Sequence, residues 1–256
     1  MNREYPSQHH PCFFLVDSLN AIGVNTEFAK DERTLGCWGM VFPGYDNRVL
    51  VYLIDNRWPH EAAKEDPAAK ELISRGAIVC HAQRRDMDRI GGYHLPLAAS
   101  PGFRPMPIAK TADCAMVGYI RDEGRARLLS DIGAKFTLNL AQNVFGKQAV
   151  ETYCSALCGV NIPTRYGDPH AYDVAMRPYE IAACGVPLVT NDLPELEELG
   201  FIDHETCITY GVNRSILEAI EIAIDNPHIG FNARQLISER HEYVHRAKQV
   251  QAWLSA

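Results

Sequence analysis

The sequence lacks three features that would place it in a membrane or on a charged polymer. None of its apolar runs approaches the ~20 consecutive residues that a helix needs to cross a bilayer. Basic residues are fewer than acidic ones, with 25 Lys and Arg against 32 Asp and Glu, and the formal net charge is −7. Such a chain has no overall attraction for nucleic acid or anionic lipid. Because the polar N-terminus carries no targeting segment, we expect a cytoplasmic protein without a membrane span.

The sequence also lacks a Cys-x-x-C motif and any tight cluster of cysteine with histidine. Its eight cysteines are scattered and lie mostly inside apolar segments, which is typical of buried thiols rather than of a disulfide framework. The closest pair, Cys154 and Cys158, is one turn apart in the helix expected there, and no third or fourth ligand lies nearby. These absences predict core thiols in a reducing compartment and no metal site.

The composition that remains is that of an ordinary globular protein. Hydrophobic residues make up 46 % of the chain and charged residues 22 %. A length of 256 residues leaves room for two modest α/β units or one large one. The chain can therefore bury a core of its own without disulfides or metals.

The first half contains the pattern of a βαβ unit. Residues 12–17 and 48–55 are short apolar runs that end in the carboxylates of Asp17 and Asp55, and both are typical of buried parallel strands. A helical pattern over 61–75 follows and is succeeded by another apolar run, 77–81. Strands alternating with helices predict an α/β fold with a parallel sheet.

A stretch rich in proline and glycine separates this half from the next. It predicts a boundary between an N-terminal lobe, 1–108, and a C-terminal lobe, 109–256. The alternation then restarts with an expected strand at 113–117 and a helix that carries Arg121, Arg125 and Arg127. The further elements expected are a strand at 135–138, a helix at 146–158, a strand at 159–162 and a polar loop at 163–174.

The most informative segment is 176–200. Pro178 fits the first turn of a short helix, Gly185 fits its left-handed end, and the apolar run 186–190 fits a buried strand before a second helix that Gly200 closes. Arg177 and Glu180 both fall in the first turn of the first helix, where free N–H groups and the helix dipole favour an anion. They can present a cation to a phosphate and a carboxylate to a ribose diol. The alternative is an exposed helix-start ion pair.

These residues carry a family resemblance. Residues 177–190 read R-P-Y-E-I-A-A-C-G-V-P-L-V-T, which resembles the donor-binding signature of the GT-B glycosyltransferases. The stretch is most similar to the spore-maturation-like, CgeB-like subgroup of the glycosyltransferase family 1/4 group. That subgroup also shows a glycine after a strand followed by arginines, here Gly118 with Arg121 and Arg125. It further shows a His-x-x-x-Arg near the C-terminus, for which this chain has the stretch from His241 to His245–Arg246. The likeness extends over roughly 77 to 254.

The resemblance implies a GT-B-like fold of two Rossmann-like lobes, with a shortened N-terminal lobe and a last helix that crosses back to it. It implies that Glu180 binds the donor ribose and that Arg177, Gly118 and Arg121 lie near the diphosphate. Related retaining enzymes carry a second glutamate eight residues before the one that corresponds to Glu180. This chain has Tyr172 at that position, beside Asp173. We expect this pair on the donor side and leave the stereochemical outcome open.

The reaction implied is that of a metal-independent hexosyltransferase that takes its sugar from a nucleoside-diphosphate sugar, most naturally a UDP-sugar, and needs no cofactor. Arginines and helix N-termini would then meet the charge of the departing diphosphate. Asp17, Asp55 and His94 in the first half are the candidate catalytic residues, although strand-end aspartates are also common helix caps. The acceptor, a saccharide, a protein or a modified DNA base, and the oligomeric state stay open.

Two other functions stay open at this stage. One is a glycosyltransferase that modifies hydroxymethylated DNA bases, which the basic run of Arg84, Arg85 and Arg89 permits and the overall negative charge disfavours. The other is a non-catalytic module of degenerate transferase fold that binds a nucleotide or docks a partner, because the first half is short and its catalytic base is unassigned.

Overall fold

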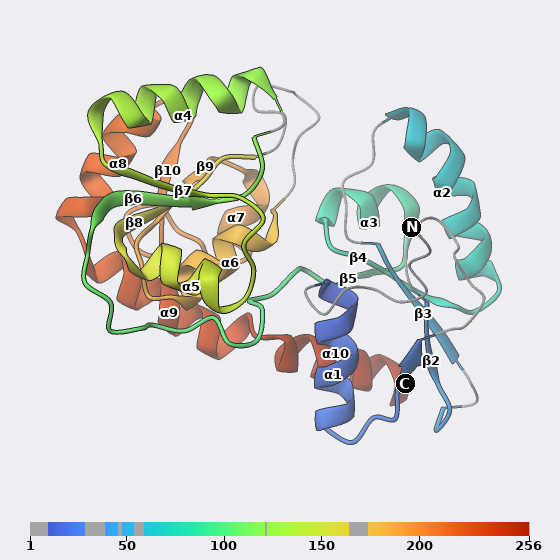
Figure 1. Ribbon diagram of the computed structural model, residues 1–256. Helices are drawn as coiled ribbons and strands as arrows, with labels where there is room; N and C mark the ends of the chain where they lie inside the picture. Colours follow the sequence, from blue (N-terminus) through green and yellow to red (C-terminus); the bar gives the residue numbers. More distant parts are fainter. Residues whose placement is uncertain are drawn as a thin grey trace. The chain divides into compact units, whose positions relative to one another are not determined.

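The computed structural model describes residues 10–28, 39–45, 48–53, 59–120, 122–163 and 174–255. The chain divides into two compact units (Figure 1). The first combines Met1–Ala98 with Glu242–Ala256, and the second is Ala99–His241. The first unit thus ends earlier than the expected boundary at 108 and takes in the last residues of the chain. Over the described ranges, no helix is both long enough and apolar enough to span a bilayer.

The first unit contains a five-stranded mixed sheet in the order β1-β2-β3-β4-β5. The strands are β1 (Glu27–Phe28), β2 (Gly39–Phe42), β3 (Arg48–Leu53), β4 (Ile78–His81) and β5 (Tyr93–His94). The pairs β1–β2 and β2–β3 are antiparallel, whereas β3, β4 and β5 run parallel. Helix α2 (Pro59–Ser74) connects β3 to β4, which confirms the expected βαβ unit, and α3 (Arg84–Ile90) connects β4 to β5.

The interpretation of 12–17 as a strand is wrong, because these residues lie in helix α1 (Pro11–Ala21). The His10 imidazole accepts a hydrogen bond from the Cys12 N–H at 3.2 Å and caps the first turn. The buried side chains of α1 recur at helical spacing, and Phe14 packs against Tyr243 of α10 (Tyr243–Ser255) with ring centroids 5.4 Å apart. Asp17 is therefore an exposed mid-helix residue and not the end of a strand.

The C-terminal helix α10 is fixed within the first unit by a buried arginine. Arg246 donates hydrogen bonds from Nε to the Pro96 carbonyl oxygen at 2.7 Å and from Nη2 to the Leu97 carbonyl oxygen at 3.0 Å. Charge-assisted bonds to backbone carbonyls are among the strong hydrogen bonds that hold a buried guanidinium in place. Arg246, which belongs to the C-terminal stretch of the family resemblance, is thus a structural residue in this unit.

The second unit contains a parallel sheet in the order β10-β9-β8-β6-β7. Its strands are β6 (Ala112–Val117), β7 (Leu138–Ala141), β8 (Ala156–Asn161), β9 (Leu188–Asn191) and β10 (Ile208–Tyr210). Its helices are α4 (Glu123–Lys135), α5 (Lys147–Cys154), α6 (Met176–Ala183), α7 (Pro194–Glu198), α8 (Ile216–Asp225) and α9 (His228–Arg240). Figure 1 shows α4 and α8 on one face of the sheet and α5 and α9 on the other. This is a doubly wound α/β arrangement.

The order of helix, strand and helix expected over 176–200 is confirmed, whereas strand β8 begins at an earlier residue than expected. The helix expected over 146–158 ends at Cys154, and the strand expected over 159–162 already begins at Ala156. The run 156–161 is almost wholly buried between two neighbouring strands, so its apolar pattern does not separate helix from strand. Cys154 and Cys158 consequently lie on different elements. The strand expected at 135–138 is β7, displaced towards the C-terminus.

Close backbone approach at one glycine holds α9 against the segment that leads into β9. A Cβ placed on Gly230 would lie 2.8 Å from the Pro187 nitrogen and closer still to the Gly185 carbonyl oxygen. Both contacts are to backbone, which cannot rotate away. Gly133 in α4 has open space where a Cβ would stand, with nothing within 4 Å, and offers a matched comparison.

We expect Gly230→Ala to lower the free energy of unfolding by about 1–3 kcal/mol, because the added methyl group is overpacked against backbone. Gly133→Ala is expected to raise it by about 0.5–1 kcal/mol, since alanine is the better helix former. Urea midpoints at equal m values measure both changes. Equal midpoints for the two variants would contradict the close approach of α9.

Candidate functional site

The order of strands reverses at one point of the second sheet. From β6 the chain crosses to β7 on one side and then returns to β8 on the other side of β6. In open α/β sheets, ligands bind beyond the carboxyl ends of the strands at such a switch point. Gly118 follows β6 directly, and Ile162 follows β8. The carboxyl ends of β6 and β8 therefore frame the candidate site.

A buried guanidinium joins these two strand ends. Arg125 is 1 % exposed, and its Nη1 donates to the Tyr119 carbonyl oxygen at 2.5 Å while its Nη2 donates to the Ile162 carbonyl oxygen at 2.6 Å. Its backbone N–H donates to the Asp122 carboxylate, which caps α4. Of the three arginines expected in this region, Arg125 thus connects the ends of β6 and β8, and Arg127 is exposed on α4.

Helix α6 begins at the same edge of the sheet. Its N-cap residue, Ala175, makes no side-chain hydrogen bond to the first turn, so the leading N–H groups are left available to an anion. Arg177 in this turn donates from Nε to the Asn161 side-chain oxygen at 3.0 Å. Asn161 is itself held, because its amide donates to the Thr190 hydroxyl at 3.0 Å and its backbone carbonyl accepts from the Tyr210 hydroxyl at 3.0 Å.

The guanidinium of Arg177 lies against the backbone of Gly118. A Cβ on Gly118 would stand 2.7 Å from Arg177 Nη1, and the φ of +150° at Gly118 is a conformation that favours glycine. Burial lowers the pKa of Arg177, and the nearby Tyr153 and Glu180 oppose this change. The structure thus brings together two residues predicted from the sequence, the glycine after β6 and the arginine that starts α6. Both lie at the switch point.

Glu180 lies one turn further along α6 and is partly exposed. Its Oε1 accepts a hydrogen bond from the Ser100 hydroxyl at 2.7 Å. Burial raises the pKa of Glu180, while the bond from Ser100 and the charge of Arg177 act to lower it. Tyr153 is buried beside this pair, and its pKa is raised by burial first and by the charge of Glu180 second. The carboxylate, the guanidinium and the phenol therefore form one electrostatically coupled group.

Three of these site residues were missed by the sequence analysis: Ser100, Tyr153 and Asn161. Asn161 had a signal, because it is a polar residue at the end of a buried apolar run, where ligand-facing side chains occur in α/β sheets. Tyr153 had none, since a tyrosine in a helix is ordinarily a core residue. Ser100 lies in the proline-rich segment, and no sequence pattern there predicts its contact with Glu180, which is 80 residues further along the chain.

Several candidate residues are not brought into this site. Arg121, Tyr172, Asp173 and Asp55 lie outside the described residues. His94 lies on strand β5 opposite His81 of β4. Strand pairing continues there through the Leu95 N–H, which donates to the His81 carbonyl oxygen at 2.9 Å. Asp17 and His94 both belong to the first unit.

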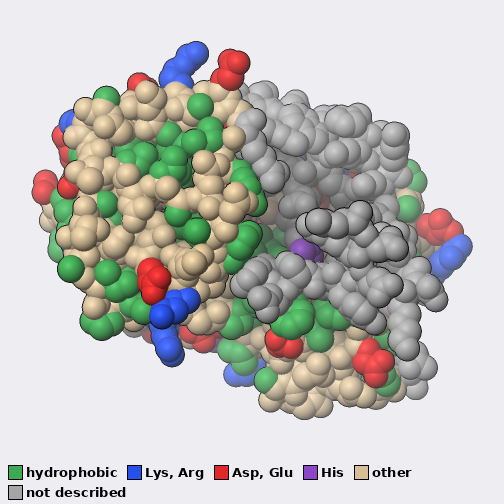
Figure 2. All heavy atoms as spheres, viewed as in Figure 1, with side chains coloured by type: hydrophobic (Ala, Val, Ile, Leu, Met, Phe, Trp, Pro, Cys, Tyr) green, Lys and Arg blue, Asp and Glu red, His purple; other side chains and the backbone are tan. Residues whose placement is uncertain are grey.

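Two of the three arginines in the basic run of α3 are paired with carboxylates. Arg84 pairs with Asp88 at 3.3 Å, and Arg89 pairs with Asp86 at 2.6 Å and with Asp66. Asp86 and Asp88 form the one Asp-x-Asp of the sequence, so both carboxylates are engaged with arginines. Among the coloured residues of Figure 2, Lys and Arg side chains are scattered and mostly near Asp or Glu. Within the described ranges, no three His, Cys, Asp or Glu side chains are grouped to hold a metal.

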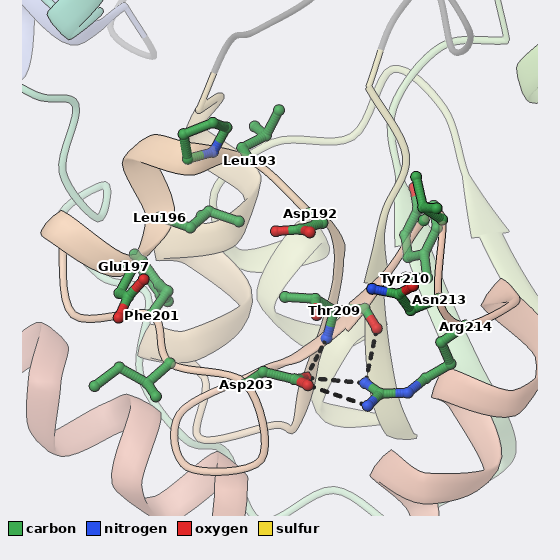
Figure 3. Close-up of a pocket in the computed structure, with 14 residues that line it drawn as sticks. Asp192, Leu193, Leu196, Glu197, Phe201, Asp203, Thr209, Tyr210, Asn213 and Arg214 are labelled. Atoms are coloured by element: carbon green, nitrogen blue, oxygen red, sulfur yellow. Dashed lines mark hydrogen bonds and ion pairs between the residues drawn. The ribbon is translucent and has the colours of Figure 1, made fainter.

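A pocket of about 470 Å³ lies at the carboxyl ends of β9 and β10, further along the same sheet edge (Figure 3). Asp203 at its wall accepts two hydrogen bonds from Arg214, at 2.9 and 3.1 Å, and one from the Thr209 N–H at 2.8 Å. Burial acts to raise the pKa of Asp203, but these bonds outweigh it and lower the pKa. The opposite charges of Asp203 and Arg214 therefore cancel on one side of the pocket.

Comparisons with known proteins agree with this geometry. The family model described as glycosyl transferase-like matches residues 109–252. A search of the curated proteins finds no significant match.

Solved structures show a similar fold at low sequence identity. AviGT4, a glycosyltransferase involved in avilamycin A biosynthesis, is 13 % identical with a TM-score of 0.51, over 69 % of this chain and 62 % of its own. Anabaena HepE, solved with UDP-glucose, is 15 % identical with a TM-score of 0.55, over 80 % and 71 %. A mutant of S. aureus TarM, solved with UDP, is 8 % identical with a TM-score of 0.58, over 80 % and 50 %. The predicted α/β, GT-B-like fold class is confirmed, and the chain is shortened relative to these proteins.

The raised pKa of Glu180 predicts a pH-dependent cost in stability. Between its ordinary value of 4.5 and the raised value, the folded protein binds more protons than the unfolded chain, so ionising Glu180 lowers stability as the pH rises. Glu180→Gln removes this cost and is expected to become more stable relative to wild type as the pH goes from 5 to 8. Urea unfolding at each pH measures the difference, with Glu198→Gln as the exposed control. A difference that shrinks with rising pH would rule out the raised pKa.

Proposed function

Since its residues 109–252 match that family model, the chain belongs to the glycosyl transferase-like family, and we propose that it transfers a sugar from a nucleoside-diphosphate sugar to a hydroxyl acceptor. The observation that carries this proposal is the meeting of Gly118, Arg177 and Glu180 at the switch point of a parallel sheet. Because HepE was solved with UDP-glucose and TarM with UDP, the proposed donor is a UDP-sugar. The CgeB-like signature over 177–185 supports placing the chain in that subgroup.

The first turn of α6 is proposed to receive the diphosphate. Its uncapped N–H groups and positive helix end suit an anion, and the missing side chain of Gly118 leaves room for the Arg177 guanidinium beside it. Arg177 is pre-oriented by Asn161 through Nε, so its terminal nitrogens are directed by a fixed contact rather than by a flexible chain. Arg121, shortly after β6, is proposed as the second cation.

Glu180 is proposed to accept hydrogen bonds from the ribose hydroxyls of the donor. A partly buried carboxylate is a strong acceptor for a neutral hydroxyl because water competes with it less than at the surface. Its spacing of three residues from Arg177 places both groups on one face of α6. Tyr172 and Asp173 are proposed to approach the donor sugar from the loop before α6.

The proposed chemistry is displacement at the anomeric carbon. The bond between that carbon and the diphosphate oxygen breaks, and its electron pair leaves on the diphosphate, where Arg177 and the N-terminus of α6 meet the new charge. The acceptor oxygen forms the new bond and gives its proton to a base. Asp17, Asp55 and His94 stay the candidates for that base.

The reaction is proposed to need neither a metal nor a cofactor, since the arginines and the helix N-terminus supply the positive charge. We expect the Kd for UDP to be the same in EDTA as in Mg²⁺ or Mn²⁺, measured by isothermal titration. A Kd more than about tenfold weaker in EDTA would assign part of the diphosphate charge to a metal.

Binding of UDP tests the site directly. Removal of a hydrogen bond to a charged group costs about 1.5–3 kcal/mol, so Glu180→Ala and Arg177→Met are each expected to weaken UDP binding by about 10- to 100-fold. Glu198→Ala, which removes an exposed carboxylate from α7 of the same unit, is the matched control and is expected to bind like wild type. Unchanged affinity in Glu180→Ala would remove Glu180 from the ribose site.

A further inference from the structure

Ser100 is a second polar group at the proposed ribose position. It is 6 % exposed, and its hydroxyl donates to Glu180 Oε1 at 2.7 Å. A serine hydroxyl has one hydrogen and two lone pairs, and an ionised carboxylate has no hydrogen to donate. The hydrogen of Ser100 is therefore already used. The Oγ lone pairs remain acceptors.

The second oxygen of Glu180 is also an acceptor. Oε2 takes part in no hydrogen bond with the residues that the structure describes, and the side chain keeps part of its solvent exposure. The Ser100–Glu180 pair thus presents neighbouring acceptors and, while Glu180 is ionised, no spare donor. Two adjacent hydroxyl groups, each with one hydrogen to give, are the complementary partner.

The hydroxyl of Ser100 is not required to hold its own segment. The Ala99 N–H donates to the His241 carbonyl oxygen at 2.8 Å, and the Ser100 carbonyl oxygen accepts from the Phe103 N–H at 3.2 Å. Backbone bonds therefore anchor the chain on both sides of Ser100. Loss of the hydroxyl removes a polar group from the site without releasing the segment.

From this arrangement we propose that Ser100 and Glu180 together accept the 2′- and 3′-hydroxyls of the donor ribose, and that Ser100 is a specificity-determining residue for ribonucleotides over deoxyribonucleotides. This inference rests on the proposed nucleotide site. Glu180 Oε2 accepts a hydrogen bond from one hydroxyl, and Ser100 Oγ accepts one from the other. The hydrogen bond from Ser100 to Glu180 Oε1 holds the two acceptors next to each other.

The test is a titration of UDP, 2′-deoxy-UDP and 3′-deoxy-UDP into wild type, Ser100→Ala and Ser100→Thr. We expect wild type to bind UDP about 10-fold or more tightly than either deoxy compound, since each lost hydroxyl removes a hydrogen bond to one acceptor of the Ser100–Glu180 pair. Ser100→Ala is expected to bind UDP and one of the two deoxy compounds more weakly than wild type does. It is expected to bind the other deoxy compound, which lacks the hydroxyl that Ser100 accepts, with the same affinity as wild type. Ser100→Thr keeps the hydroxyl and is expected to keep the preference.

Ser155→Ala is the matched control. Ser155 is a comparably buried serine of the same unit whose hydroxyl donates to the Thr152 carbonyl oxygen and accepts from Asn139, so its loss should leave the UDP to deoxy-UDP ratios unchanged. Equal weakening of all three compounds by Ser100→Ala, or no weakening, would reduce Ser100 to a structural contact and overturn the inference. Wild type that binds none of the three compounds would instead overturn the proposed nucleotide site.

Discussion

The buried guanidinium of Arg125 is the constraint on which the rest of the second unit depends. The carboxyl ends of β6 and β8 diverge into separate loops, and each loop has a carbonyl group that a strand partner would otherwise satisfy. Arg125 donates to both carbonyls, those of Tyr119 and Ile162, and so fixes the gap between the loops. A buried cation is costly, but its removal would leave two carbonyl groups without these donors. The ends of β6 and β8 are therefore tied to each other through one side chain.

Arg177 and Glu180 depend on this fixed edge in different ways. Arg177 is oriented by Asn161, which belongs to β8 and is held in turn by Thr190 of β9 and Tyr210 of β10. Its position is thus set by three adjacent strands. Glu180 is oriented from outside the sheet by Ser100. Partial burial of a cation and an anion on one short helix costs stability, and this is the usual trade between stability and function at a binding site.

The sequence was sufficient where glycine and proline mark the ends of elements. Gly185 and Gly200 have φ values of +69° and +85°, and Pro178 and Pro194 lie in the first turns of α6 and α7. The elements of 176–200 were therefore predicted in the right order, although β9 begins at Leu188 and not at residue 186. It was not sufficient over 12–17, because an unbroken apolar run shows no period until its neighbours are included. Continued to Leu19, the same run has the spacing of a buried helix face.

The site was predictable only in part for a different reason. Arg177, Glu180 and Gly118 lie at positions that helix and strand ends mark in the sequence, and they were found. Ser100 contributes through a contact across 80 residues of sequence, and no local pattern encodes such a pairing. The sequence predicted a helix that carries Arg121, Arg125 and Arg127, but helical spacing alone does not reveal which of several arginines points inwards.

The return of α10 to the first unit has a consequence for synthesis on the ribosome. Ala99–His241 is one continuous stretch, so it has all of its residues before translation reaches α10. Met1–Ala98 lacks the helix that packs against α1 until Glu242–Ala256 has been made. Domains generally fold as units as the chain emerges. The unit whose synthesis starts first is therefore completed after the other, and the apolar side of α1 has its packing partner only once α10 has emerged.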